Sequence, residues 1–144
     1  MFSKACEYGI RAVIHIAVES LEGNRVSLKS TAKEIQSPEA FTAKILQLLT
    51  KSEIISSIKG PNGGFEIERK KMNEIKLIQI VSAIDGDSIF RGCGLGLKEC
   101  SEIRPCPVHN KFKKIRSDLH HMLENTTIYE LARNLKKGTS FLKG

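Results

Sequence analysis

Three of the four cysteines lie close together, in a segment rich in glycine and proline. Cys93, Cys100 and Cys106 follow the pattern C-x6-C-x5-C. Thiolates are the usual ligands of iron–sulfur clusters, and a flexible loop can wrap three of them around one cluster. A tetrahedral zinc site of three cysteines and one histidine would use the same residues. Cysteines also pack as small buried hydrophobes, but these three lie among Gly, Lys, Glu and Arg. The pattern therefore favours a metal centre and leaves the metal open.

The compartment sets the expected state of these thiols. The sequence has neither a signal-peptide hydrophobic region nor a run of roughly 20 apolar residues that would span a membrane. We therefore expect a cytoplasmic protein without membrane contact, in a reducing environment where structural disulfides are rare. The fourth cysteine, Cys6, falls in a predicted helix and is expected to be a packing residue.

The chain is basic, with a formal net charge of +7 and a pI of about 9.3. Such a balance favours an anionic partner, with nucleic acid first. The excess of Lys and Arg is spread over both halves of the sequence, so charge alone locates no binding face.

The N-terminal half predicts three helices. Apolar residues recur at helical spacing over residues 3–21. Ser27 is the predicted N-cap of a second, short helix. Ser37 can cap a third helix, with Pro38 at its first position and Glu39 at the positive end of its dipole. On the third helix the predicted buried residues are Phe41, Ile45, Leu48 and Leu49, and the predicted outward residues are Thr42, Lys44, Gln47 and Lys51.

A hairpin follows these helices. Residues 54–58 and 65–68 alternate between apolar and polar side chains, which predicts two short strands around the glycine-rich turn 59–64. The basic run 69–71 is predicted to end the second strand. Three helices followed by a hairpin are the chain order of a winged helix-turn-helix, which places its recognition helix in the major groove of DNA. The candidate DNA contacts are Ser27, Ser37, Thr42, Lys44, Gln47, Lys59, Gly60, Pro61, Asn62, Gly63 and Gly64.

The C-terminal half predicts a fourth helix that ends at Gly86, then residues 87–107 without useful periodicity. A fifth helix begins near residue 108 and carries an a/d seam suited to packing against another helix. Thr127 opens a last helix, and Gly138 ends it. The seam residues are Val108, Phe112, Ile115, Leu119 and Met122.

We thus expect a mainly α-helical chain with a small β-hairpin, a winged helix-turn-helix followed by a long helix that packs against another helix. Its regions are 1–86 for DNA binding, 87–107 for the cysteine loop, and 108–138 for the long helix and the C-terminal helix, all in one compact domain.

Several motifs resemble those of the Rrf-type winged-helix regulators, the family of IscR, NsrR, RirA and CymR. The likeness covers nearly the whole chain. It lies in Ser3-Lys4-Ala5-Cys6-Glu7-Tyr8-Gly9-Ile10-Arg11-Ala12, in Lys59-Gly60-Pro61-Asn62-Gly63-Gly64-Phe65, in Ile84-Asp85-Gly86 and in Thr126-Thr127-Ile128. The resemblance implies a homodimeric transcriptional regulator, acting as a repressor on double-stranded DNA with a pseudo-palindromic operator. It implies that the long helix in 108–138 is the dimerisation helix and that 87–107 is a cluster-binding loop. It also implies an iron–sulfur cluster that senses nitric oxide, redox state or iron supply.

The resemblance also implies two possible fourth ligands beside Cys93, Cys100 and Cys106. His109 lies at the offset where IscR-like members place a ligand histidine, which favours a 2Fe–2S cluster. Glu7 matches the position from which some NsrR-like members supply a carboxylate across the dimer, which would favour 4Fe–4S. We prefer His109. The family usually has one residue fewer between the first two cysteines, so a bulge is expected at 95–97.

Two other classes of protein compete with this interpretation. An enzyme with Cys93 or Cys106 as nucleophile lacks support, because the sequence has no C-x-x-C pair and no His–Asp arrangement. A zinc-stapled or metal-free winged-helix regulator, or a protein-interaction module, would explain the same pattern, and metal analysis separates these possibilities.

Overall fold

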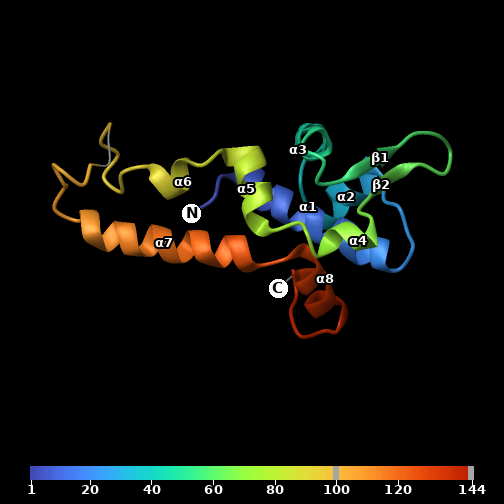
Figure 1. Ribbon diagram of the computed structural model, residues 1–144. Coiled ribbons are helices and arrows are strands. Elements are labelled where there is room, and N and C mark those ends of the chain that lie inside the picture. Colours follow the sequence, from blue (N-terminus) through green and yellow to red (C-terminus); the bar gives the residue numbers. More distant parts are fainter. Residues whose placement is uncertain (99–100, 143–144) are drawn as a thin grey trace.

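The computed structural model describes residues 1–98 and 101–142, and it consists of a helical body from which one long helix projects (Figure 1). The elements of the body are α1 (Lys4–Leu21), α2 (Leu28–Ile35), α3 (Glu39–Lys51), β1 (Ser56–Ile58), β2 (Gly64–Glu66), α4 (Arg69–Met72), α5 (Leu77–Asp85) and α8 (Ile128–Lys136). The projecting part contains α6 (Ser88–Arg91) and α7 (His109–Asn125). The predicted mainly helical fold with one small hairpin is confirmed.

Helix α1 forms the centre of the body. It begins at the N-cap Ser3, whose hydroxyl accepts a hydrogen bond from the backbone N–H of Cys6 at 3.0 Å. Its buried stripe includes Val13, Ile16 and Ala17, all fully buried. Helices α2, α3, α5 and α8 pack around this stripe, so α1 connects every part of the body.

Helices α2 and α3 form the helix-turn-helix. As predicted, Ser27 caps α2, and its hydroxyl accepts the backbone N–H of Ser30 at 3.0 Å. Gln36 ends α2 in the left-handed conformation at φ 55°. The predicted cap of α3 is wrong, since Pro38 occupies the N-cap in an extended conformation. The hydroxyl of Ser37 instead lies 3.4 Å from the carbonyl of Pro38, and Ser37 is buried.

The buried face of α3 differs from the predicted one. Ile45 and Leu49 are buried as expected, and Phe41 is partly buried against the core, but Leu48 is 41% exposed. Thr42, predicted to point outward, is fully buried. Its hydroxyl donates to the carbonyl of Pro38 at 2.9 Å, so the polar atom is satisfied within the helix and the methyl group packs inward. Leu46 completes this buried face.

The hairpin pairs β1 and β2 antiparallel, with Ser57 opposite Phe65. A backbone bridge between Val26 and Phe65 adds a third segment beside β2 and joins the start of α2 to the hairpin. The second strand ends before the basic run, and that run forms the four-residue helix α4, which the sequence did not predict.

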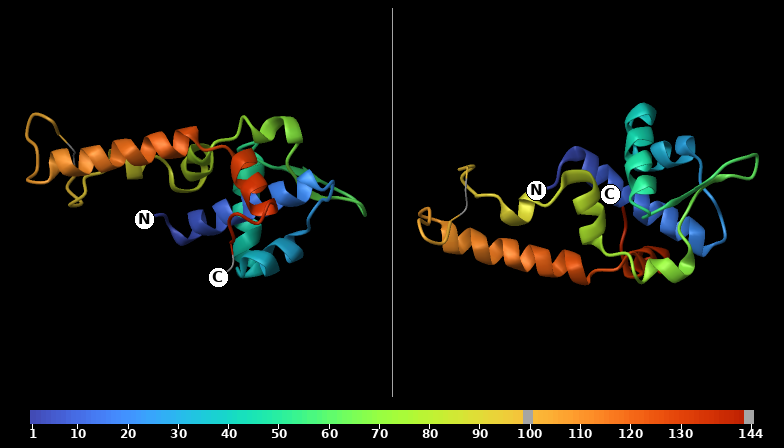
Figure 2. Two further views of the ribbon diagram at one scale, coloured as in Figure 1. Left: turned by 90° about the horizontal axis from the view of Figure 1, so that it is seen from below. Right: turned by 45° about the horizontal axis from the view of Figure 1, so that its top comes forward.

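The chain leads away from the body through α6, and the long helix α7 returns to the body beside α6 and α5 (Figures 1 and 2). Gly86 ends α5 with φ 74°, as predicted, but residues 87–107 are not wholly irregular, since α6 forms one helical turn there. Two backbone hydrogen bonds hold α8 beside the start of α5, from Leu77 N–H to the Thr126 carbonyl and from Ile128 N–H to the Ile75 carbonyl, each at 3.0 Å. No helix within the described residues is long and apolar enough to cross a membrane.

The predicted seam of α7 lies partly in solvent. Ile115 is 60% exposed and Met122 is 46% exposed, while Phe112 and Leu119 are half-buried. Leu123, near the point where α7 joins the body, is fully buried. The structure therefore leaves an apolar face on α7 that is uncovered within the described chain.

Candidate DNA-binding surface and cysteine loop

The exposed face of α3 carries two of the predicted base-reading residues. Lys44 and Gln47 are both exposed, one turn apart on the second element of the helix-turn-helix. Thr42 was predicted to contact DNA, and this prediction is wrong, because its side chain is buried and bonded within the helix and so is not available to a base edge. Ser37 is likewise buried. Ser27 is exposed, but its hydroxyl is engaged in capping α2.

The glycine-rich turn at residues 59–64, the wing of the hairpin, has a geometry that requires glycine at all three of its glycine positions. Gly60 adopts φ 106°, and the N–H of Gly63 donates to the Gly60 carbonyl at 2.9 Å. A Cβ on Gly63 would lie 2.1 Å from the carbonyl oxygen of Ile58. The turn is consequently tight, and it exposes Lys59, Pro61 and Asn62 at its tip.

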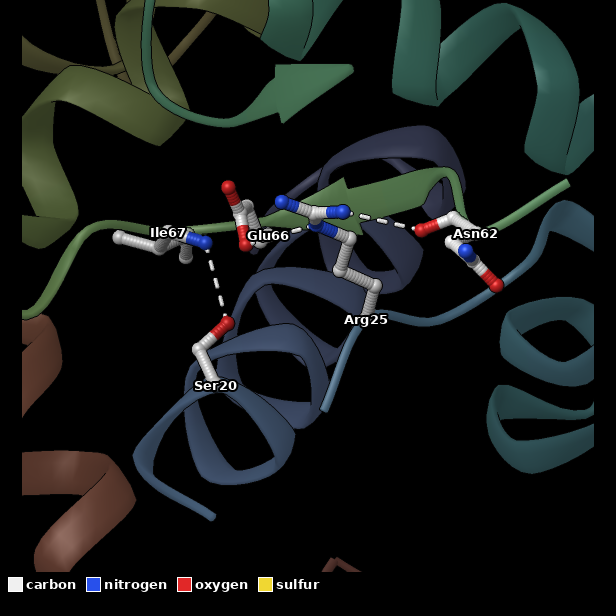
Figure 3. A network of polar contacts seen from close by, with 5 residues as sticks. All are labelled: Ser20, Arg25, Asn62, Glu66 and Ile67. Carbon is white, nitrogen blue, oxygen red and sulfur yellow. Dashed lines mark hydrogen bonds and ion pairs between the residues drawn. The ribbon is translucent and has the colours of Figure 1, made fainter. Parts of the chain in front are cut away.

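Arg25 anchors this wing to the body, a role that sequence patterning did not reveal (Figure 3). Its Nε donates to Glu66 Oε2 at 3.0 Å, and its Nη1 donates to the backbone carbonyl of Asn62 at 2.9 Å. The base of the hairpin is held separately, since Ile67 N–H donates to the Ser20 hydroxyl at 3.0 Å. In the sequence, Arg25 is a lone Arg between two predicted helices, and its carboxylate partner Glu66 lies more than 40 positions away.

Two of the three loop cysteines come together at the end of α7 that is distant from the body. The backbone N–H of Leu95 lies 3.4 Å from the Cys93 sulfur. Hydrogen bonds from the N–H groups of Leu95 and Leu97, together with one from the Cys106 thiol, hold the pKa of Cys93 below its usual value. Thiolates are the metal-binding form of cysteine, so the loop geometry favours the ligand state.

His109 lies beside Cys106 on the first turn of α7. Its backbone N–H donates to the Cys106 carbonyl at 3.1 Å, and its side chain is only 7% exposed. The pKa of Glu102 is lowered mainly by the hydrogen bond and the charge of Lys113, and to a smaller extent by the charge of His109. The Glu102–Lys113 ion pair and a hydrogen bond from Arg116 to the Gly92 carbonyl tie both ends of the loop to α7.

The ligand set of the predicted centre is described only in part. Cys100 lies outside the described residues, and among the described ones no group of three or more His, Cys, Asp and Glu side chains is close enough to hold a metal ion. Two adjacent thiols and a buried imidazole are nevertheless a donor set that suits an iron–sulfur cluster or zinc. Glu7 is exposed on α1 and pairs with Lys4 at 3.6 Å. Cys6, by contrast, is fully buried.

Comparison with known proteins settles the family. The model of the Rrf2 family, described as an iron-dependent transcriptional regulator, matches residues 2–134. The chain belongs to the Rrf2 family. The members that it matches are transcriptional regulators and not enzymes, as the sequence predicted.

Three relatives illustrate the range within the Rrf2 family. A candidate HTH-type transcriptional regulator of Aquifex aeolicus is 29% identical, over 91% of this chain and 90% of that protein. The NsrR regulator of Oceanobacillus iheyensis is 24% identical, over 91% of this chain and 88% of that protein. The IscR regulator of Escherichia coli is 25% identical, over 88% and 76%.

Solved structures of Rrf2 regulators confirm the winged-helix fold. CymR, the global cysteine regulator of B. subtilis, superimposes with a TM-score of 0.74 at 21% identity, covering 92% of this chain and 96% of its own. IscR of T. potens gives the same TM-score at 19% identity, covering 98% and 92%. At these identities the likeness concerns the fold alone.

Proposed function

We propose that this Rrf2 regulator works as a cytoplasmic homodimer that represses transcription from a pseudo-palindromic operator, under the control of an iron–sulfur cluster held by the loop at the tip of α7. The observation that carries the proposal is the pairing of Cys93 with Cys106 at one end of α7, with backbone N–H groups directed at the Cys93 sulfur and the buried His109 three residues after Cys106.

DNA recognition is assigned to α3 and the wing. In a helix-turn-helix the second helix enters the major groove, where polar side chains reach base edges. Gln47 presents an amide suited to a base edge, and Lys44 presents a charge suited to guanine or phosphate. Lys59 and the glycine backbone of the wing would contact phosphate and sugar. The anchor from Arg25 holds the wing against the segment that precedes α2.

The cluster site is assigned to Cys93, Cys100, Cys106 and His109, with a 2Fe–2S cluster preferred. When bound, such a cluster supplies a centre that reacts with nitric oxide and oxidants and depends on iron supply. The residues of the loop orient the thiols, while the burial of His109 keeps its imidazole from bulk water. If Glu7 of a second subunit replaces His109, a 4Fe–4S cluster fits better.

Dimerisation is assigned to α7. The exposed apolar side chains of Ile115 and Met122 lie seven residues apart, which is the repeat of a helix–helix seam. A second copy presenting the same face would cover them, because two-fold dimers are self-complementary. Two α3 helices would then face half-sites about one turn of DNA apart.

The cluster assignment is tested by purifying the protein without oxygen and measuring its visible spectrum with its iron, sulfide and zinc content. We expect absorption at roughly 320–460 nm with matched iron and sulfide. Two irons per chain support His109, and four support Glu7. Cys93→Ala and Cys106→Ala should lose the cluster, whereas Cys6→Ala, which removes a buried thiol outside the loop, should keep it. A colourless protein with stoichiometric zinc would contradict the proposal and establish a zinc-stapled regulator.

The DNA surface is tested with duplexes selected from a random library by the wild-type protein. Gln47→Ala should relax the sequence preference at one position of each half-site, by about 1–3 kcal/mol. Lys44→Ala should weaken binding and lower its salt dependence if it contacts phosphate. Lys136→Ala removes the same charge from α8 and serves as the control. Equal effects of Lys44→Ala and Lys136→Ala would contradict the assignment of α3 as the recognition helix.

A further inference from the structure

Two sequence motifs lie outside the DNA surface and the cysteine loop, and the fold brings them together. One is the N-terminal segment that begins at Ser3, and the other is the end of α5 at Asp85. The backbone N–H of Ser3 donates to Asp85 Oδ2 at 3.0 Å, and the Ser3 hydroxyl donates to Oδ1. Asp85 thus holds the N-cap of α1 through two hydrogen bonds, and we call this group the Ser3–Asp85 junction.

The junction lies directly before the segment that leads to the cysteines. Asp85 is the last residue of α5, and Gly86 follows with φ 74°, which ends the helix. One turn of helix, α6, then runs beside α7 to Cys93. A movement of α6 relative to the body must therefore be absorbed near Gly86, next to the carboxylate that holds α1.

The other side of the junction leads to the recognition helix. Tyr8, on the same stretch of α1, meets Phe41 of α3 edge to face, with ring centroids 5.7 Å apart. At Gly9 the three helices converge, because a Cβ there would lie 2.2 Å from Ile84 Cδ1 and 3.5 Å from Ile45 Cγ2. The first turns of α1 consequently fill the space between the end of α5 and the start of α3, without room for independent movement.

We propose that the Ser3–Asp85 junction couples the cysteine loop to the recognition helix, with Asp85 as a positioning residue that contacts neither DNA nor metal. The inference rests on the proposed cluster function and names the route by which the loop acts on α3. Ser3 is exposed and Asp85 is half-buried, so water can replace the hydrogen bonds between them when α6 moves. The junction can therefore open and close without exposing the core.

The test compares Asp85→Ala and Ser3→Ala with the wild-type chain and with Asp87→Ala. Asp87 is the matched control, since it is an exposed carboxylate in the same segment and pairs only locally with Arg91 at 3.1 Å. The first measurement is the ratio of affinities of cluster-loaded and cluster-free protein for duplexes selected by the wild-type protein. We expect a wild-type ratio of at least about fivefold. Asp85→Ala should bring it within about twofold with unchanged iron content, while Asp87→Ala keeps it.

The second measurement needs no cluster. Hydrogen exchange of the cluster-free proteins should be faster in Asp85→Ala than in the wild type at the first turns of both α1 and α3, and unchanged at α8. Asp87→Ala should leave both turns protected. If the wild-type protein bound DNA equally well with and without the cluster, the proposed function would be contradicted. A folded Asp85→Ala that keeps the full affinity ratio, or whose α3 exchanges at the wild-type rate, would overturn the junction.

Discussion

At the scale of single residues, the cysteines occupy opposite chemical environments. Burial, followed by the charge and hydrogen bond of Asp85, raises the pKa of Cys6 to about 12. Hydrogen bonds from the backbone of Leu95 and Leu97 lower the pKa of Cys93. Only the thiolate is an effective nucleophile. In cluster-free, reduced protein at pH 7.5, we expect iodoacetamide to alkylate Cys93 about tenfold or more faster than Cys6, as measured by peptide mass spectrometry. Equal labelling of the two in folded protein would contradict these environments.

The raised pKa of Cys6 also predicts how stability depends on pH. The thiol is neutral in both states below its ordinary pKa of 9.0, so its contribution is fully present there. Above pH 9 the unfolded chain loses this proton first, and the contribution falls as the pH rises toward 12. Between pH 8 and 10.5 the wild-type free energy of unfolding should fall by about 2 kcal/mol more than that of Cys6→Ala. If urea titrations showed the same loss of unfolding free energy in the two proteins, Cys6 would not be involved.

Residue types and spacing identified the caps Ser27 and Thr127 but not the cap of α3, and they could not give the orientation of Thr42. A threonine whose hydroxyl bonds to the carbonyl four residues earlier buries its methyl group as a valine would. Leu48 is exposed in exchange, because the inward face of α3 lies at Thr42, Ile45, Leu46 and Leu49. Which of two similar helix faces packs inward depends on tertiary contacts, and those are absent from a local pattern.

At the scale of elements, the hairpin depends on a side chain that lies outside it. Arg25 joins the wing to the segment before α2 through Glu66 and the Asn62 carbonyl. Arg25→Ala should free the tip of the wing and weaken DNA binding by about three- to tenfold, with the helical content unchanged. Binding to selected duplexes, measured by fluorescence anisotropy, checks this effect. Arg133→Ala removes the same charge from α8 as the control, and an equal loss in both variants would point to net charge instead.

The sequence predicted the helices that have clear caps and periodicity, among them α1, α2 and α5. It missed α4 and α6, which are four residues long, because a single turn is too short to show a repeat. It also missed the Ser3–Asp85 junction. Its partners lie 82 positions apart, and only the packing of α1 against α5 brings them together.

At the scale of the whole molecule, the apolar face of α7 predicts the oligomeric state. Ile115→Glu should place a charge in the proposed seam and convert a dimer, of twice 16.0 kDa, to a monomer. Ser117→Glu adds the same charge to an exposed residue on another side of α7 and should leave the dimer intact. Light scattering after size-exclusion chromatography measures both masses. A wild-type monomer, or a dimeric Ile115→Glu, would exclude this face as the interface.

The cysteine loop and the DNA surface lie at opposite ends of the molecule, and α7 separates them (Figure 1). Its 17 residues span about 25 Å. A tip attached in this way can gain or lose residues at little entropic cost, because lengthening a loop is inexpensive. Exchanging residues 92–108 for a loop with another ligand set should leave operator choice intact. Evolution can therefore change the signal that the loop detects without changing the operator that α3 and the wing bind.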